Sequence, residues 1–231
     1  MVLTATDVAK AAAGMVLTQP GLAGIVAAVR EGRVTFQRVQ TYALNSILKK
    51  VVSVLFLVAG LAMTGQAVLA PLLMMIVMIT GDVLGMALTT DRVVASGTPN
   101  AWRIGRLILA GVVLGACLLA FLSAVLAVGA FGLRLETGAL QSLAFMSLVF
   151  GGQAAIYAIR GRRHVWGLRP SRWVLASSAA DVAISSGLAI GGVAMTPLPA
   201  LLVGSLLAAT VAFAFVLALV KVPVFTRLGV V

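Results

Sequence analysis

The chain has 231 residues, of which 61% are hydrophobic and only 10% are charged, and its mean hydropathy is +1.14. Soluble domains average about 45–50% apolar and about 25% charged residues, so this composition excludes an ordinary soluble protein. The net charge of +11 comes from Lys and Arg residues in short clusters between long apolar runs, with no basic face interleaved with aromatic residues. This pattern argues against nucleic acid as a partner and is typical of membrane topology.

The first 33 residues differ in character from the rest of the chain. Thr6 precedes a short Ala-rich stretch, Met15 to Leu17 form an apolar run, and Pro20 precedes a helical pattern that ends at Arg33. These features predict a capped helix, a strand and a second helix. A single strand can neither pair its edges nor bury a core, so segment 1–33 is expected to be an incomplete α/β unit in the cytoplasm. Whether it folds alone stays open.

Six apolar segments are each long enough to cross a bilayer core of about 30 Å, which takes about 20 residues. They lie at about 44–63, 68–89, 104–129, 139–159, 173–195 and 200–220. A helix that begins at Val34 has no Gly or Pro before Gly60, so residues 34–50 are expected to be a stalk entering the first span. The sequence therefore predicts an all-α integral membrane protein, with a six-helix membrane domain over 44–220 and a cytoplasmic tail over 221–231. Three glycine pairs have the spacing that lets membrane helices pack closely: Gly81 and Gly85, Gly111 and Gly115, and Gly187 and Gly191.

The basic residues divide unequally between the two sides of this predicted bundle. Six spans place both ends of the chain on one side and three short links, at 64–67, 130–138 and 196–199, on the other. Of the 17 basic residues, the links hold only Arg134. By the positive-inside rule we expect a multi-pass protein with both termini in the cytoplasm. The basic cluster between Arg160 and Arg172 is expected to contact anionic lipid headgroups.

Several motifs along the chain point to one family. The chain contains, in order, Thr6–Lys10, Met15–Thr18, Ile25–Val26 and Glu31–Arg33. These segments resemble the end of the phosphorylation domain of P-type ATPases. More specific motifs are Leu17–Leu22, Phe36–Arg38 with Tyr42, Asp82, Asp91–Val93, Pro99, Trp102 and Arg169–Pro170. Together they resemble the plasma-membrane proton-exporting subfamily, over essentially the whole chain.

This resemblance implies a particular part of an ATP-driven proton translocase. It implies the end of the phosphorylation domain followed by the last six transmembrane helices, in the plasma membrane. Nothing in the sequence resembles the Asp-Lys-Thr-Gly-Thr phosphorylation site, the nucleotide-binding domain or the first four spans, which lie upstream in the family. ATP and Mg²⁺ are therefore implied for a complete pump, no cofactor is expected in this chain, and the chain is expected to be inactive alone. The implied partners are protons, membrane lipid and a missing N-terminal half; a truncated pump remnant is the alternative.

Two carboxylates lie within the predicted spans, Asp82 and Asp181, and a carboxylate in a membrane is a functional-site hypothesis by default. Asp82 is flanked by Gly81 and Gly85, which loosen the helix and let backbone approach a ligand. The resemblance also implies that this position carries the proton. Asp181 is expected to be a secondary carboxylate with a structural or tuning role, because hydroxyls lie near it that could bond to it across helices: Ser177, Ser178, Ser185 and Ser186.

The first span is too short unless it includes a lysine. Only 13 residues, Val51 to Met63, lie between Lys50 and the link that begins at Thr64, which is about 20 Å of helix. Counted from the hairpin tip near Gly65, Lys50 and Asp82 come to similar depth. Lys50 is therefore a candidate counter-charge for Asp82, and Lys49 is a second candidate. The alternative is that both lysines extend to the headgroups.

The predicted site holds one strong carboxylate, which suits a proton better than Ca²⁺ or Mg²⁺, since these ions take about six or more oxygen ligands. We therefore expect no metal site, and no catalytic residue in this chain. Two alternatives to the proton pump stay open. One is a P-type pump for another cation, and the other is a non-catalytic membrane protein that binds partners or lipid.

Overall fold

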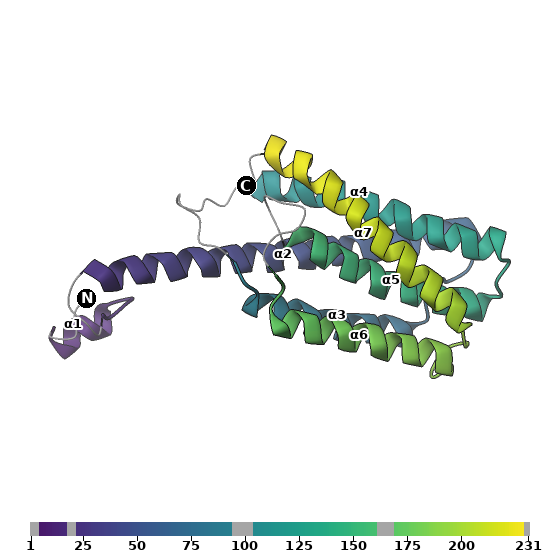
Figure 1. Cartoon of the computed structure of the whole chain (residues 1–231), viewed down its shortest axis with the longest axis horizontal. Coiled ribbons are helices and arrows are strands. Elements are labelled where there is room, and N and C mark those ends of the chain that lie inside the picture. The colour runs from purple at the N-terminus through teal and green to yellow at the C-terminus, as the bar shows by residue number, and fades with distance from the viewer. Residues whose placement is uncertain (1–4, 18–21, 94–103, 161–168, 229–231) are drawn as a thin grey trace.

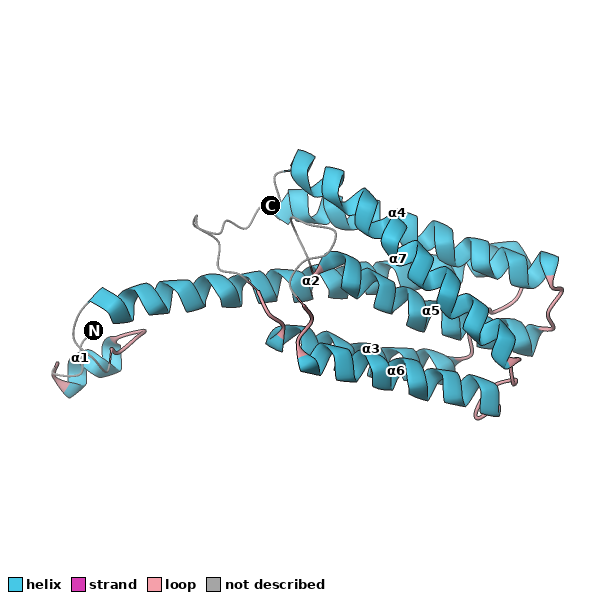
Figure 2. Ribbon diagram, in the orientation of Figure 1, coloured by secondary structure: helices cyan, strands magenta, loops and turns pink. Residues whose placement is uncertain are grey.

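The computed structural model describes residues 5–17, 22–93, 104–160 and 169–228, and it is built of helices (Figure 2). No strand occurs in these ranges. The elements are α1 (Asp7–Ala12), α2 (Leu22–Thr64), α3 (Pro71–Ala87) with a 3-10 turn η1 (Leu88–Thr90), α4 (Ile104–Ala127) with a π turn η2 (Val128–Gly132), α5 (Thr137–Ile159), α6 (Arg172–Gly191) and α7 (Ala200–Leu228). Six of them are long and apolar enough to cross a membrane, which confirms the six predicted spans.

Helix α2 is a single rod that begins outside the bundle and ends inside it (Figure 1). Its 43 residues give a length of about 65 Å, roughly twice the thickness of a bilayer core. The two helices predicted on either side of Arg33 are one helix, so the predicted end there is wrong. An isolated glycine such as Gly32 costs a helix only about 1 kcal/mol, too little to end it. The part of α2 inside the bundle buries one stripe at helical spacing: Leu44, Leu48, Val52, Phe56 and Gly60.

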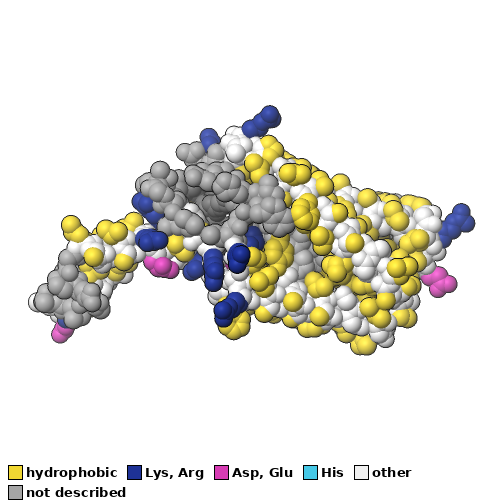
Figure 3. Space-filling view, viewed as in Figure 1, with side chains coloured by type: hydrophobic (Ala, Val, Ile, Leu, Met, Phe, Trp, Pro, Cys, Tyr) yellow, Lys and Arg dark blue, Asp and Glu magenta, His cyan; other side chains and the backbone are white. Residues whose placement is uncertain are grey.

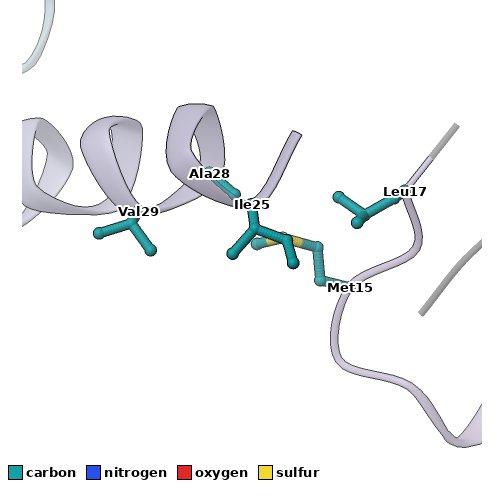
Figure 4. A pocket seen from close by; sticks show the side chains of 5 residues that line it. All are labelled: Met15, Leu17, Ile25, Ala28 and Val29. Carbon is teal, nitrogen blue, oxygen red and sulfur yellow. The ribbon is translucent and has the colours of Figure 1, made fainter. Parts of the chain in front are cut away.

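The N-terminal segment is also simpler than predicted. Helix α1 begins directly after Thr6, as expected, although the Thr6 side chain makes no capping hydrogen bond. Residues 15–17 are non-helical, and no strand is assigned to them; within this stretch Leu17 forms only an isolated β-bridge. Instead, the side chains of Met15 and Leu17 line an apolar pocket against the start of α2 (Figure 4). The residues around Pro20, at 18–21, lie outside the described part of the chain.

Helix α5 is the centre of the bundle. Of its membrane-crossing part 89% is buried, against 22–33% for the other five helices. It packs against α7, α4, α6, α3 and α2, and its buried residues lie on all sides and are mostly small or apolar, with Gln153 the large polar exception. Helix α4 lies against α2, and the rings of Phe121 on α4 and Phe213 on α7 stack with centroids 4.3 Å apart. Helix α7 continues past the predicted end of the sixth span, through Pro223.

The three short links meet at one end of the bundle, as the six-span topology predicts. The Thr137 hydroxyl donates a hydrogen bond to the Gln66 side-chain oxygen at 2.6 Å, and the Gln141 amide donates to the Ala67 carbonyl oxygen at 2.9 Å. Figure 3 shows Lys and Arg side chains gathered around the other end, where α2 leaves the bundle, and hydrophobic side chains along the face between the ends. Such an apolar belt is expected where lipid surrounds a protein.

Two of the three predicted glycine pairs face α2. A Cβ atom placed on Gly111 would lie 2.9 Å from Leu44, and one placed on Gly81 would lie 2.5 Å from the Lys49 ammonium. Glycine therefore lets α4 and α3 approach α2 closely. The third prediction does not hold in the described structure, because a Cβ on Gly187 would have no described neighbour within 4 Å.

Candidate functional site

The Lys49 side chain fills a slot between two glycines on neighbouring helices. Its ammonium donates a hydrogen bond to the Gly81 carbonyl oxygen on α3, at 3.1 Å. On the other side, a Cβ placed on Gly152 of α5 would lie 3.5 Å from the Lys49 Cε atom. The absence of a side chain at position 81 makes room for the lysine, since a Cβ there would lie 2.5 Å from the ammonium nitrogen, whereas one on Gly152 would make an ordinary contact. A carbonyl oxygen can accept a second hydrogen bond besides its helical one. Lys49 is thus held inside the bundle by backbone.

Of the two candidate lysines, the structure brings Lys49, and not Lys50, against α3. Successive residues of a helix point about 100° apart, so only one of two neighbours can face the bundle interior. Lys50 lies on the exposed side of α2, whereas Lys49 is half-buried. Counting residues along a helix gives the depth of a side chain in the membrane but not the side of the helix on which it lies. This explains why the sequence favoured Lys50.

Asp82 directly follows the glycine that Lys49 contacts. Its side chain lies on an exposed face of α3 in the described structure, while Gly81 faces inward. Its carboxylate and that of Asp181 both attract the Lys49 ammonium. The structure therefore brings both sequence-predicted carboxylates within electrostatic reach of the same lysine.

Asp181 on α6 is only 6% exposed, and it accepts its hydrogen bond from Gln153, a residue outside the serines that the sequence analysis named near it. The Gln153 amide of α5 donates to Asp181 Oδ2 at 2.5 Å, and the Ser178 hydroxyl donates to the Gln153 side-chain oxygen at 2.7 Å. The expectation that serines bond to Asp181 is thus replaced by a bond from Gln153, which is itself oriented by Ser178. Among the described residues, the second oxygen, Oδ1, is buried and has no hydrogen-bond partner.

A second polar cluster lies where α2 leaves the bundle and centres on Asp91, which is 4% exposed. Both carboxylate oxygens pair with the Arg160 guanidinium, at 2.9 and 3.0 Å, and Oδ1 also accepts the Ser171 backbone N–H at 2.9 Å. The Asp91 carbonyl oxygen accepts from Arg38 Nε of α2 at 3.0 Å. This one residue therefore joins four elements: the stalk part of α2, the end of η1, the end of α5 and the start of α6.

The sequence noted Asp91 only as part of a motif and missed this role. A motif shows which residues recur together, but it does not show which partners the fold supplies. The single available signal was charge: Asp91 and Arg160 both follow directly on the cytoplasmic ends of predicted spans.

The described part of this chain contains no group of three or more His, Cys, Asp or Glu side chains that could hold a metal ion. The charged groups within the described spans include the Lys49 ammonium of α2 and the carboxylates of Asp82 on α3 and Asp181 on α6. Six apolar helices that carry such groups define the class: a multi-pass integral membrane protein with ionisable side chains within its spans.

Comparison with known proteins identifies the family within this class. No protein-family model matches the chain. It is 30% identical over 165 residues to a cation-transporting ATPase of Methanocaldococcus jannaschii. The aligned region covers 71% of this chain and 20% of that protein. It is 39% identical over 114 residues to a plasma membrane ATPase of Dunaliella bioculata, which covers 49% of this chain and 10% of that protein. The chain thus corresponds to a C-terminal portion of P-type ATPases, and it matches about a fifth or less of the length of these relatives.

Proposed function

We propose that this chain is the C-terminal membrane portion of an ATP-driven proton-exporting pump of the plasma membrane, with Asp82 as the proton-binding group and Lys49 as its counter-charge. The observation that carries the proposal is the position of Lys49. Its side chain lies between Gly81 and Gly152, and Gly81 directly precedes Asp82 in the chain. The plasma membrane ATPase of Dunaliella bioculata supports the location and the subfamily by its similarity.

A positioned ammonium offers a physical means of controlling a proton. An opposite charge close to a carboxylate favours its ionised form, and removal of that charge favours the protonated form. Any movement of Lys49 relative to Asp82 would therefore change how tightly the carboxylate holds its proton. A pump needs such a change to be driven by two alternating states of the protein.

Helix α2 is suited to transmit a conformational change from outside the bundle to Lys49. It runs without a break from outside the bundle to Thr64, and Lys49 lies on its buried part. A displacement at the outer end of a continuous helix moves the whole rod, because its hydrogen bonds keep it stiff over this length. The hydrogen bond from Arg38 to the Asp91 carbonyl oxygen ties the same helix to the end of α3.

The proposal assigns both termini to the cytoplasm and ATP hydrolysis to a segment outside this chain. The gathering of Lys and Arg side chains around the end of the bundle from which α2 extends supports this orientation (Figure 3). The upstream half, with its phosphorylation site, ATP and Mg²⁺, would act on the outer part of α2. It is either part of a longer chain or a separate polypeptide.

Transport in inverted membrane vesicles tests the proposal. The chain is expressed together with the upstream phosphorylation and nucleotide-binding segment, and ATP-dependent acidification of the vesicle interior is followed with a pH-sensitive dye. We expect acidification, and we expect Asp82→Asn to abolish it while Asp7→Asn, a change at an exposed residue of α1, leaves it intact. Unchanged acidification by Asp82→Asn would remove Asp82 from the role of carrier.

A pump for another cation is the second candidate, favoured by the similarity to the cation-transporting ATPase of Methanocaldococcus jannaschii. The same vesicles distinguish it. ATP hydrolysis that depends on an added metal cation, and that proceeds without acidification, would support this candidate and contradict proton export.

A further inference from the structure

The buried face of α6 is unusual for a membrane helix because it is polar. Its buried residues recur at helical spacing: Val174, Ser178, Asp181, Ser185 and Ala189. Its exposed side carries large apolar residues such as Ile184 and Ile190. A helix that turns a carboxylate and two hydroxyls toward the protein interior marks a functional polar path or site rather than simple packing.

The hydrogen bonds around Asp181 leave one of its oxygens ready to take a proton. The Ser178 hydroxyl donates to the Gln153 side-chain oxygen, which fixes the amide so that its nitrogen faces Asp181 Oδ2. Oδ1 is buried with no hydrogen-bond partner among the described residues, and so is the Ser185 hydroxyl one helical turn further along α6. A buried ionised carboxylate that receives a single hydrogen bond is strongly disfavoured, and binding a proton at the free oxygen removes its charge.

The charges near Asp181 favour the binding of one proton. Lys49 is the ammonium within electrostatic reach of both Asp181 and Asp82, and Gly152, which borders its slot, is adjacent to Gln153. One ammonium and two carboxylates carry a net charge of one negative unit, which a single proton neutralises. The other described titratable or charged groups on the elements that pack against α6 are Asp82 on α3, Tyr157 and Arg160 on α5, Asp91 after η1, and Lys221 and Arg227 on α7.

Most of these groups are engaged or lie at the end of the bundle. Arg160 is paired with Asp91 at 2.9 Å, and Lys221 lies within electrostatic reach of Arg160. Arg227 is exposed near the end of α7. Lys49 is a cation that Asp82 and Asp181 have in common.

We propose that Asp181 is a second proton-binding carboxylate of this membrane domain, which takes its proton on Oδ1 and shares the Lys49 ammonium with Asp82. The proton comes from water and forms an O–H bond with Oδ1, while Oδ2 continues to accept from Gln153. Protonation of Asp181 leaves Lys49 to Asp82, and ionisation of Asp181 draws Lys49 back. The two carboxylates are thereby coupled through one side chain.

Infrared spectroscopy of the full chain in lipid vesicles tests this directly. A protonated carboxyl group gives a C=O stretching band that an ionised one lacks, and this band is followed as the pH is raised. We expect a band that is present in wild type and in Asp82→Asn and is lost in Asp181→Asn. An undiminished band in Asp181→Asn would overturn the proposal.

Two further variants keep the test decisive if Asp181→Asn fails to fold. Gln153→Leu removes the donor to Oδ2 but keeps the carboxylate, so the band should persist to higher pH by about one unit or more, a tenfold change in proton affinity. Lys49→Met should act in the same direction, because it removes the cation that favours ionisation. Ser177→Ala, at a half-buried serine beside the polar face, is the control and should leave the midpoint unchanged. No shift in either Gln153→Leu or Lys49→Met would contradict the proposal.

This experiment is independent of the proposed pump. It measures proton binding in the chain itself and uses neither ATP nor transport. Loss of the band in Asp181→Asn would stand even if Asp82 proved not to be the carrier. Conversely, if Asp181 bound no proton, the acidification test of Asp82→Asn in vesicles would remain valid.

Discussion

The Lys49 ammonium donates a hydrogen bond to the Gly81 carbonyl oxygen at 3.1 Å, immediately before the carboxylate of Asp82 in the chain. This contact exists because position 81 has no side chain. A Cβ there would lie 2.5 Å from the ammonium nitrogen, closer than any stable contact. The glycine is thus a requirement of the lysine on α2, and it links α2 to α3 at the level of the candidate site.

Gly81→Ala should therefore expel Lys49 from its slot. The change removes a hydrogen bond from a charged donor, which contributes about 1.5–3 kcal/mol, so the free energy of unfolding should fall by about that amount. Thermal or denaturant unfolding of the chain in detergent, followed by circular dichroism, measures this change. ATP-driven acidification should fall as well, because Lys49 no longer lies at a fixed distance from Asp82.

The matched control for this prediction is Gly187→Ala on α6. It makes the same chemical change in a membrane helix at a position where an added Cβ meets nothing within 4 Å. Alanine forms helix better than glycine by up to about 1 kcal/mol, so this variant should be as stable as wild type or more so. Equal destabilisation by both variants would show that Lys49 is not the cause.

Asp91→Asn should be the most destabilising single change at the end of the bundle where α2 leaves. Asp91 and Arg160 form a buried two-point ion pair, and removal of one charge leaves the other buried and unpaired. Breaking such a pair costs about 3–5 kcal/mol. Denaturant unfolding in detergent measures the loss.

Two companion variants test whether the loss of stability in Asp91→Asn comes from the broken ion pair. Arg160→Lys keeps the positive charge but loses the forked geometry, so it should fall between wild type and Asp91→Asn. Asp7→Asn removes a carboxylate that is 99% exposed and should leave the unfolding free energy nearly unchanged. If Asp91→Asn behaved like Asp7→Asn, the four elements would be held together by packing alone.

A third prediction compares two glycines of α2. A Cβ on Gly60 would lie 2.5 Å from Val68 and 3.1 Å from Leu126, whereas one on Gly32 would have no described neighbour within 4 Å. Gly60→Ala should force α2 away from α4 and destabilise the bundle by about 1–3 kcal/mol, because the core is overpacked. Gly32→Ala should raise the helicity of the stalk and stabilise it by about 0.5–1 kcal/mol. Unfolding curves of both variants in detergent test the pair, and an opposite order of stability would contradict the described packing.

The sequence predicted the membrane part of the fold well because lipid imposes strong rules. A span needs about 20 apolar residues, and the resulting six segments appear as six helices. The sequence predicted one helix that ends at Arg33 and a second that begins at Val34, whereas the structure has a single helix, Leu22–Thr64. The strand at residues 15–17 was predicted from apolar content, which does not show how far strand pairing extends, and in the structure Leu17 forms only an isolated β-bridge.

The candidate site was predicted less completely, because the sequence does not show which way each side chain points from its helix. Residue counting placed Lys50 and Asp82 at similar depth, but the facing side of α2 follows from the helical phase, which selects Lys49. Gln153 and Asp181 are 28 positions apart on different helices, so their bond depends on the pairing of α5 with α6. No local pattern contains that information.

The last prediction uses the neighbouring residues Lys49 and Lys50. They are the same residue type at a similar depth in the bundle, but their side chains point to different sides of α2. If Lys49 is the counter-charge of Asp82, Lys49→Met should reduce ATP-driven acidification by about 10–100-fold, which corresponds to the loss of a charged hydrogen bond of about 1.5–3 kcal/mol. Lys50→Met should leave acidification close to wild type, because Lys50 lies on the exposed side of α2. The expression level and the unfolding temperature of both variants are measured alongside, so that loss of fold is separated from loss of transport. A larger effect of Lys50→Met on acidification would restore the lysine that the sequence favoured, and it would mean that α2 turns by about one residue during transport.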